Sequence, residues 1–115
     1  MLNQSARLDL AFQALADPTR RGMLARLSQG PASVSELARP LPISLPAVLQ
    51  HLQALEASGL VSSEKKGRIR TCRIVPEALG VAETWISEQR ALWAARLDRF
   101  DEHVMRLKQE GKDNG

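Results

Sequence analysis

The stretch ISLPAVLQHLQALEASGLVSSEKKGRIRTCRIV, residues 43–75, changes its periodicity near the middle. In its first part, Ser44 is placed to cap a helix that Gly59 can end. Apolar residues recur there at helical spacing, and the face that they form consists of Val48, Leu52 and Leu55. The sequence therefore predicts an amphipathic helix between Ser44 and Gly59.

The second part of the stretch has the composition of a β-hairpin. One strand is expected to begin at Leu60, and Lys66-Gly67 is placed to make a turn. The second strand is favoured by Ile69, Thr71, Cys72, Ile74 and Val75. Lysine and arginine crowd this hairpin: residues 61–75 hold five cations and one anion, a net +4, while the whole chain is +3. Such a patch suggests contact with a polyanion. The alternative is a solvated hairpin whose lysines only protect its edge strands from aggregation, because such a hairpin would have the same composition.

Helices are expected on both sides of this stretch. SVSE, residues 33–36, fits a capping box at the start of a short helix, and Asp17-Pro18 is placed to begin an earlier one. A first helix is indicated by the spacing of Leu8, Ala11, Phe12 and Leu15, and a long last helix runs from Glu77 to about Glu110. The order α-α-α-α-β-β-α, mainly α with a small β-hairpin, is that of a winged helix–turn–helix. We expect one such domain over residues 1–110 and a disordered tail over 111–115. A small α+β domain with another purpose stays open, because fold does not fix function.

The helix between Ser44 and Gly59 holds no Lys or Arg, although its place is that of a reading helix. At 100° per residue, Gln50 points away from the core and Leu49 lies on the flank. A glutamine amide can bond to adenine, and a leucine can contact a thymine methyl. The predicted base-facing residues are Ser44, Pro46, Ala47, Leu49 and Gln50.

Cations elsewhere are expected to bind the DNA backbone, because phosphate contacts dominate affinity. The candidates on the wing are Lys65, Lys66, Arg68 and Arg70, and those flanking the helix–turn–helix are Arg20, Arg21 and Arg39. Some of these arginines are expected to pair with Glu64 or Asp17 instead.

The motifs ALADPTRR (14–21), SLPAVLQHLQALEASGLV (44–61) and GRIRTCR (67–73) resemble the ArsR/SmtB family of bacterial winged-helix repressors. With the terminal helices, the resemblance covers nearly the whole chain. It implies a homodimer that binds an imperfect inverted repeat in an operator, with the first and last helices at the dimer interface. Relatives usually carry polar residues where Leu45 and Leu49 stand, and often a basic one at Gln50, so a different operator sequence is expected. Leu45 itself is expected to be half buried.

The expected last helix is longer than a small domain needs to cover its own core. Roughly 34 residues span about 50 Å at 1.5 Å per residue, and an apolar stripe with two tryptophans can serve a core and a partner. The predicted dimer-interface residues are Leu8, Phe12, Trp85, Trp93, Leu97 and Phe100. The alternative is that both tryptophans belong to a monomer core.

An effector site is harder to find. The metal sensors of the resembled family use paired cysteines in the third helix, where SVSELARPL has none, or Asp, His and Glu on the last helix. Asp101, Glu102 and His103 lie there, but one His is a poor match, so neither a metal site nor a cofactor is expected. Cys72 lies beside Arg70 and Arg73, which could favour a thiolate. A metal- or redox-responsive sensor therefore stays an alternative.

Other classes of protein find little support. The sequence shows no signal peptide and no apolar run of about 20 residues, so a cytoplasmic location is expected. Two His and one Cys offer little for nucleophilic catalysis, and no glycine-rich phosphate loop appears, so an enzyme is not expected. A winged-helix adaptor that binds proteins without specific DNA binding remains the third reading.

Overall fold

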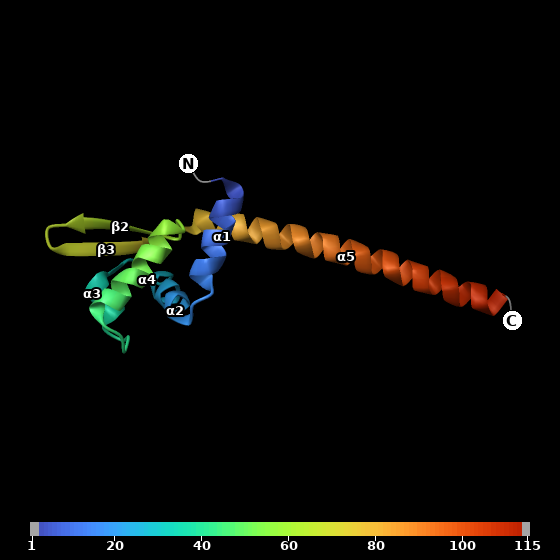
Figure 1. Cartoon of the computed structure of the whole chain (residues 1–115), viewed down its shortest axis with the longest axis horizontal. Helices are drawn as coiled ribbons and strands as arrows, with labels where there is room; N and C mark the ends of the chain where they lie inside the picture. The colour runs from blue at the N-terminus through green and yellow to red at the C-terminus, as the bar shows by residue number, and fades with distance from the viewer. Residues whose placement is uncertain (1–2, 114–115) are drawn as a thin grey trace. The chain divides into compact units, whose positions relative to one another are not determined.

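The computed structural model describes residues 3–113 and confirms the mainly helical fold with a small sheet (Figure 1). Its elements are α1 (Gln4–Leu15), α2 (Pro18–Leu27), β1 (Ala32–Ser33), α3 (Val34–Ala38), α4 (Leu45–Ala57), β2 (Val61–Lys66), β3 (Ile69–Ile74) and α5 (Pro76–Asp113). The chain divides into two compact units, one up to Ala82 and the other from Glu83 onward. A single domain over residues 1–110 stays a prediction.

Helices α2, α3 and α4 each begin where the sequence predicts a capping residue. The carboxylate of Asp17 accepts a hydrogen bond of 3.0 Å from a backbone N–H in the first turn of α2. The hydroxyls of Ser33 and Ser44 accept equivalent bonds of 3.1 and 3.3 Å at the starts of α3 and α4. These caps satisfy backbone groups that have no partner within the helix, and so they fix where the reading helix begins.

The core of the first unit is formed by the predicted apolar helix faces. α1, α2 and α3 each contact α4, and α2 and α3 also contact β3. The larger buried side chains are Met23, Leu24, Leu27, Leu37, Val48, Leu52, Leu55, Leu60, Val61 and Cys72. Each such leucine or valine stabilises the fold by about 1.5–3 kcal/mol relative to an exposed one. This packing covers one face of α4 and leaves the opposite face exposed to solvent.

The sheet has three antiparallel strands in the order β1–β3–β2. β2 and β3 form the predicted hairpin, with Gly67-Arg68 as its two-residue loop, one residue later than expected. Gly67 has a φ of 62°, which a type II′ turn requires at its first loop position. β1 was not predicted: Ala32 lies opposite Cys72, and the strand ends where the cap of α3 begins. Two residues are too few to show an alternating pattern.

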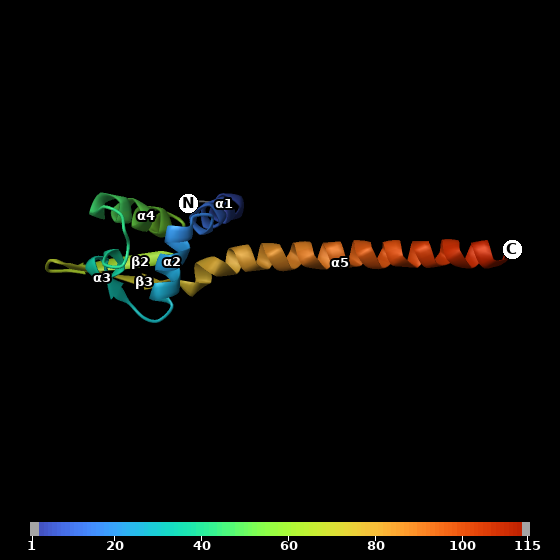
Figure 2. The ribbon, with the colours of Figure 1, turned by 90° about the horizontal axis from the view of Figure 1, so that it is seen from below.

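Helix α5 is one continuous helix (Figure 2). It begins one residue before the expected start and continues to Asp113, so residues 111–113 of the expected tail are helical. Residues 114–115 of that tail lie outside the described residues. In the described part of the chain, no helix combines the length and the apolar character that crossing a membrane requires.

Candidate nucleic-acid interface

Helix α4 exposes the face that the sequence predicts for reading bases. Val48 and Leu52 on the inner face are fully buried, whereas Gln50 is exposed and Leu49 keeps 40% of its surface open. Ser44 and Pro46 are also exposed, and Ala47 is half buried. The outward face of α4 is therefore apolar and amide-bearing, without a cation.

Leu45, the first residue of α4, is 54% exposed, which agrees with the half-buried position that its angle on the helix predicts. Together with Leu49, it leaves apolar surface open at the start of α4.

A hollow of about 480 Å³ lies beside the exposed face of α4. It is lined by Pro46, Leu49, Gln50, Leu52, Gln53 and Glu56 of α4 together with Arg70 of β3. Three of the five predicted base-facing residues thus line one concave surface, while Ser44 and Ala47 do not line it. Gln53 and Glu56 also line the hollow but were not among the predicted base-facing residues. Gln53 points away from the core on the same helical wheel.

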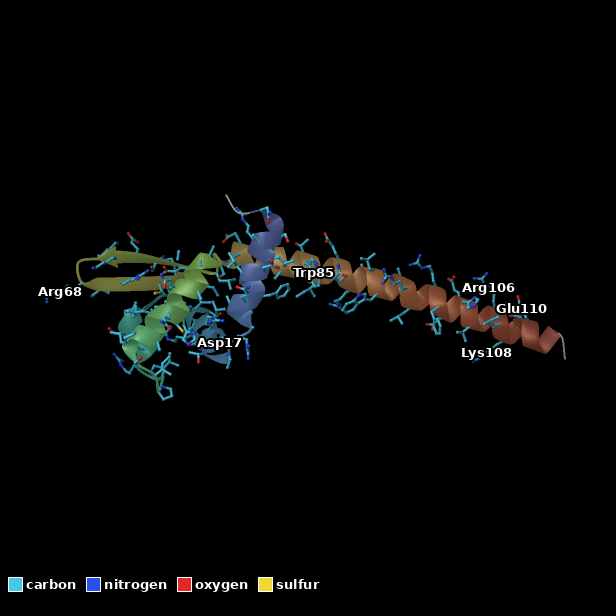
Figure 3. The ribbon with its side chains drawn as sticks, in the orientation of Figure 1. Asp17, Arg68, Trp85, Arg106, Lys108 and Glu110 are labelled. Carbon is cyan, nitrogen blue, oxygen red and sulfur yellow. The ribbon has the colours of Figure 1, made fainter. Side chains whose placement is uncertain are left out.

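The tip of the hairpin carries cations that are open to solvent. Lys65, Lys66 and Arg68 are exposed, and no hydrogen bond or ion pair within residues 3–113 engages their side chains. Figure 3 shows Arg68 at the end of the β2–β3 hairpin. Arg39, at the end of α3, is also exposed. These four retain the positive charge that a phosphate contact needs.

Arg70 has another partner. Its Nη2 donates to both carboxylate oxygens of Glu56, at 2.7 and 2.9 Å, and its Nε donates to the hydroxyl of Ser63 at 2.8 Å. The Ser63 hydroxyl donates in turn to Glu56 Oε1 at 2.7 Å. The charge of Arg70 is therefore balanced by the last turn of α4, and its assignment to phosphate stays a prediction. Some of the candidate arginines were expected to pair with Glu64 or Asp17, and the carboxylate that Arg70 meets is that of Glu56.

Arg20 is also engaged within the protein. Its Nε and Nη2 donate to the carbonyls of Ala14 and Gln13 at 2.9 and 2.8 Å, and its Nη1 is 3.3 Å from Nδ1 of His51. Arg20 thus supplies donors to the last turn of α1, where the Gln13 carbonyl also accepts the backbone N–H of Ala16 at 3.3 Å. Its donors are engaged within the fold, and its assignment to phosphate stays a prediction.

Arg21 is engaged by only one of its nitrogens. Its Nη1 donates to the carbonyl of Leu15, the last residue of α1, at 2.7 Å, and its side chain is otherwise exposed. A guanidinium has further N–H donors in a fixed fork. Arg21 therefore still has donors that a phosphate could use, whereas those of Arg20 face its own fold.

Asp17 links the start of α2 to the middle of α4. Its carboxylate accepts the backbone N–H of Arg20, and Nδ1 of His51 lies 3.8 Å away. The hydrogen bond to the backbone, together with the nearby charges, lowers the pKa of Asp17 below its ordinary value. Figure 3 labels Asp17 among the helices of the first unit.

The remaining sensing candidates do not form a site. Cys72 is completely buried, and burial raises the pKa of its thiol, which is the opposite of the thiolate-prone hypothesis. His103 is exposed on α5. Within residues 3–113, no three His, Cys, Asp or Glu side chains gather as a metal ion would require.

The predicted interface residues of α5 are exposed. Trp85, Trp93, Leu97 and Phe100 keep between 42% and 63% of their surface open, so they are not the core of a monomer within the described chain. On α1, Phe12 is 36% exposed and Leu8 is half buried. Their assignment to a dimer interface stays a prediction.

Comparisons with known proteins agree with this architecture. Residues 15–64 match a family model described as a helix–turn–helix domain. The chain is similar to the HTH-type transcriptional regulator Rv2034 of Mycobacterium tuberculosis, with 47% identity over 76 residues that cover 66% of this chain and 71% of the relative. The crystal structure of the ArsR family transcriptional regulator RHA00566 is 49% identical, has a TM-score of 0.77, and matches over 82% of this chain and 97% of its own.

A third similar protein is Mb0332 from Mycobacterium bovis, whose solution structure is described as a homodimeric winged helix–turn–helix DNA-binding domain of a possible ArsR-family regulator. It is 31% identical, with a TM-score of 0.56 and coverage of 77% of this chain and 82% of the other. The identities, the coverage and the shared winged helix–turn–helix agree with the motifs at residues 14–21, 44–61 and 67–73. The chain therefore belongs to the ArsR/SmtB family of winged helix–turn–helix transcriptional regulators.

Proposed function

We propose that this protein represses transcription as a homodimer, in which each protomer reads half of an inverted-repeat operator. Helix α4 reads the bases, and the tip of the hairpin binds the phosphates on either side. The observation that carries this proposal is the separation of chemistry on one surface: the exposed face of α4 has no cation, and open cations lie at the hairpin tip. Phosphate contacts position a protein on DNA, and contacts to base edges specify the sequence.

The base-reading half of the proposal rests on Gln50 and Leu49. The amide of Gln50 can make two hydrogen bonds to an adenine edge, and Leu49 can contact a thymine methyl. Pro46 and Ala47 add small apolar surface at the start of the helix. Ser44 keeps its hydroxyl in the helix cap and can contact a phosphate from the same position. We therefore expect an operator in which A·T pairs face α4.

The phosphate-binding half rests on the residues that keep an open charge. Lys65, Lys66 and Arg68 form the wing tip, a name that we use below for these three residues. Arg39 and the unengaged donors of Arg21 flank it. Arg20 and Arg70 are left out, because their guanidinium groups are bonded within the protein.

The homodimer is supported by the exposed apolar stripe on α5. Ile86, Trp93, Phe100 and Leu107 recur at every seventh residue, and all four are exposed. Leu97 and Val104 fall between them, giving the alternating spacing of four and three residues that is typical of a coiled-coil seam. Mb0332, a similar protein, is described as homodimeric. A symmetric dimer reads two half-sites about one helical turn apart.

The test uses the full-length protein and the DNA upstream of its own gene. A mobility-shift titration should show a complex at concentrations that leave a shuffled duplex of equal length unbound. Footprinting should show two symmetric half-sites about 10 base pairs apart, centre to centre. Equal affinity for the shuffled duplex would refute an operator repressor. If no duplex shifts even at low salt, a protein–protein adaptor replaces it.

A further inference from the structure

Three side chains tie the reading helix to the hairpin. Glu56 lies in the last turn of α4, Ser63 in the middle of β2, and Arg70 near the start of β3. Four hydrogen bonds of 2.7–2.9 Å join them into a closed set, which we call the wing clamp (Glu56, Ser63 and Arg70). Figure 1 shows α4 running beside the base of the hairpin, and α4 contacts β2.

The strand register explains how the wing clamp forms. Arg70 lies opposite Lys65 in the hairpin, and Ser63 is two residues before Lys65, on the same face of the strand. Arg70 and Ser63 are thus diagonal neighbours, within reach of a long side chain. The hairpin places the guanidinium, and the end of α4 supplies the carboxylate that it meets.

The geometry of the bonds restrains orientation as well as distance. Arg70 offers a planar fork, and one of its nitrogens reaches both oxygens of the Glu56 carboxylate. The Ser63 hydroxyl accepts from Arg70 and donates to Glu56, so the three groups are fixed relative to one another. The Glu56 side chain is 26% exposed and that of Arg70 is 41% exposed, so the pair is only partly screened by solvent.

We propose that Arg70 is a positioning residue, which sets the angle of the wing against α4 through Glu56 and Ser63 and does not bind phosphate. The proposal rests on the proposed function, since it assigns how the two DNA-contacting elements reach adjacent parts of one duplex. Arg70 and Glu56 also line the hollow that holds Leu49 and Gln50, so the wing clamp borders the reading surface. A change in the clamp shifts the wing tip relative to the bases that α4 meets.

The experiment compares Arg70→Gln, Glu56→Gln and their combination with Arg68→Gln, a matched change two residues away on the wing tip. For each variant, operator affinity is measured from about 0.05 to 0.3 M salt. Arg68→Gln should make the dependence of log K on log salt shallower by about 0.9 for each phosphate that is no longer neutralised. Arg70→Gln and Glu56→Gln should each weaken operator binding about tenfold, the effect of removing a charge-assisted hydrogen bond, with an unchanged slope. The double variant should be no weaker than the weaker single variant.

A phosphate-binding Arg70 predicts different results. Arg70→Gln would then flatten the salt dependence as Arg68→Gln does, and Glu56→Gln would strengthen binding by releasing the guanidinium. Either result overturns the proposal. The exchanged pair Glu56→Arg with Arg70→Glu should recover most of the affinity that Arg70→Glu alone loses, and failure to recover it also counts against the clamp.

Amide hydrogen exchange of the free protein tests the wing clamp without DNA. Arg70→Gln and Glu56→Gln should both raise exchange over residues 61–74, whereas Arg68→Gln should leave it at the wild-type rate. Unchanged exchange in Arg70→Gln would overturn the positioning role. If exchange behaves as expected but neither Arg68→Gln nor Gln50→Ala alters DNA binding, the clamp stands and the proposed function fails.

Discussion

Helix α4 and the β2–β3 hairpin lie next to each other and present opposite chemistry. The exposed surface of α4 is apolar and amide-bearing, whereas the hairpin tip carries three cations without partners among residues 3–113. A cation that contacts phosphate adds affinity for any duplex, because phosphates lie beside every base. In the proposed function, the absence of charge on α4 leaves the discrimination between sequences to short-range contacts, and the wing supplies affinity that does not depend on sequence.

The same comparison shows that the number of cations in a segment does not tell which of them are open to a phosphate. Of the four cations on the hairpin between residues 65 and 70, three are open and one is balanced by the end of α4. The balanced one, Arg70, lies on the hairpin and is hydrogen-bonded to α4, so it connects the two regions. The following changes should separate the two regions, beginning with the largest effect.

Reversing the wing tip should nearly abolish DNA binding. Lys65→Glu, Lys66→Glu and Arg68→Glu together replace three cations of each protomer with anions that repel phosphate, so affinity at about 0.1 M salt should fall on the order of 10³-fold. Operator and shuffled duplex should lose affinity equally, measured by fluorescence anisotropy. The triple glutamine variant is the control and should lose less, because it adds no negative charge. A loss confined to the operator would contradict the assignment of this region to phosphates.

Disrupting the proposed dimer should reduce the contributions of α4 and of the hairpin to operator binding at the same time. Phe100 is 62% exposed on the α5 stripe, and Phe100→Glu should give a monomer by sedimentation velocity. Two linked half-sites bind roughly 10² to 10⁴ times more tightly than one, so operator affinity should fall by about that factor. Affinity for an isolated half-site should stay the same.

Met105→Glu provides the matched control for that change. Met105 is also exposed on α5, but around the helix axis it lies about 140° from Phe100 and about 100° from Val104. The variant should remain dimeric and bind the operator as the wild type does. A monomeric Met105→Glu variant would place the interface elsewhere on α5.

How much of the difference between α4 and the hairpin the sequence predicts depends on how far apart in the chain the interacting residues lie. The caps at Asp17, Ser33 and Ser44 and the buried face of α4 follow from neighbours within four residues, and all were predicted correctly. The partner of Arg70 lies 14 residues earlier in the chain, and it is brought close only by the packing of α4 against the hairpin. No local pattern marks that pair.

The same limit applies to Arg20. It was predicted from its charge to bind phosphate, yet its guanidinium donates to the carbonyls of Gln13 and Ala14 in the last turn of α1 and lies against His51 of α4. The packing of α1, α2 and α4 brings these partners together, and the sequence pattern does not contain that packing.

Removing one base contact should reduce discrimination without altering the charge. Gln50→Ala should weaken operator binding by about 1–3 kcal/mol, the range for one good bidentate base contact, and leave shuffled duplex unaffected. Gln53→Ala, one turn further along the same exposed face, is the matched control and should cost less, because it is farther from the start of the helix. Unchanged operator affinity in Gln50→Ala would mean that α4 reads bases with other residues.

The smallest effect concerns the start of α2, which packs against α4, and it disappears in acid. The pKa of Asp17 is lowered in the folded protein, chiefly by the backbone hydrogen bond at the start of α2, so the folded state binds fewer protons than the unfolded state. Its contribution to stability is therefore complete above the ordinary aspartate pKa of about 3.9 and is lost as the pH falls through the lower folded value. In Asp17→Asn, which keeps an acceptor but no charge, denaturant unfolding should show a deficit that is constant above about pH 5 and disappears toward about pH 2. A deficit that does not change with pH would mean that the cap acts through its shape alone, and that the carboxylate's charge does not help to hold α2 against α4.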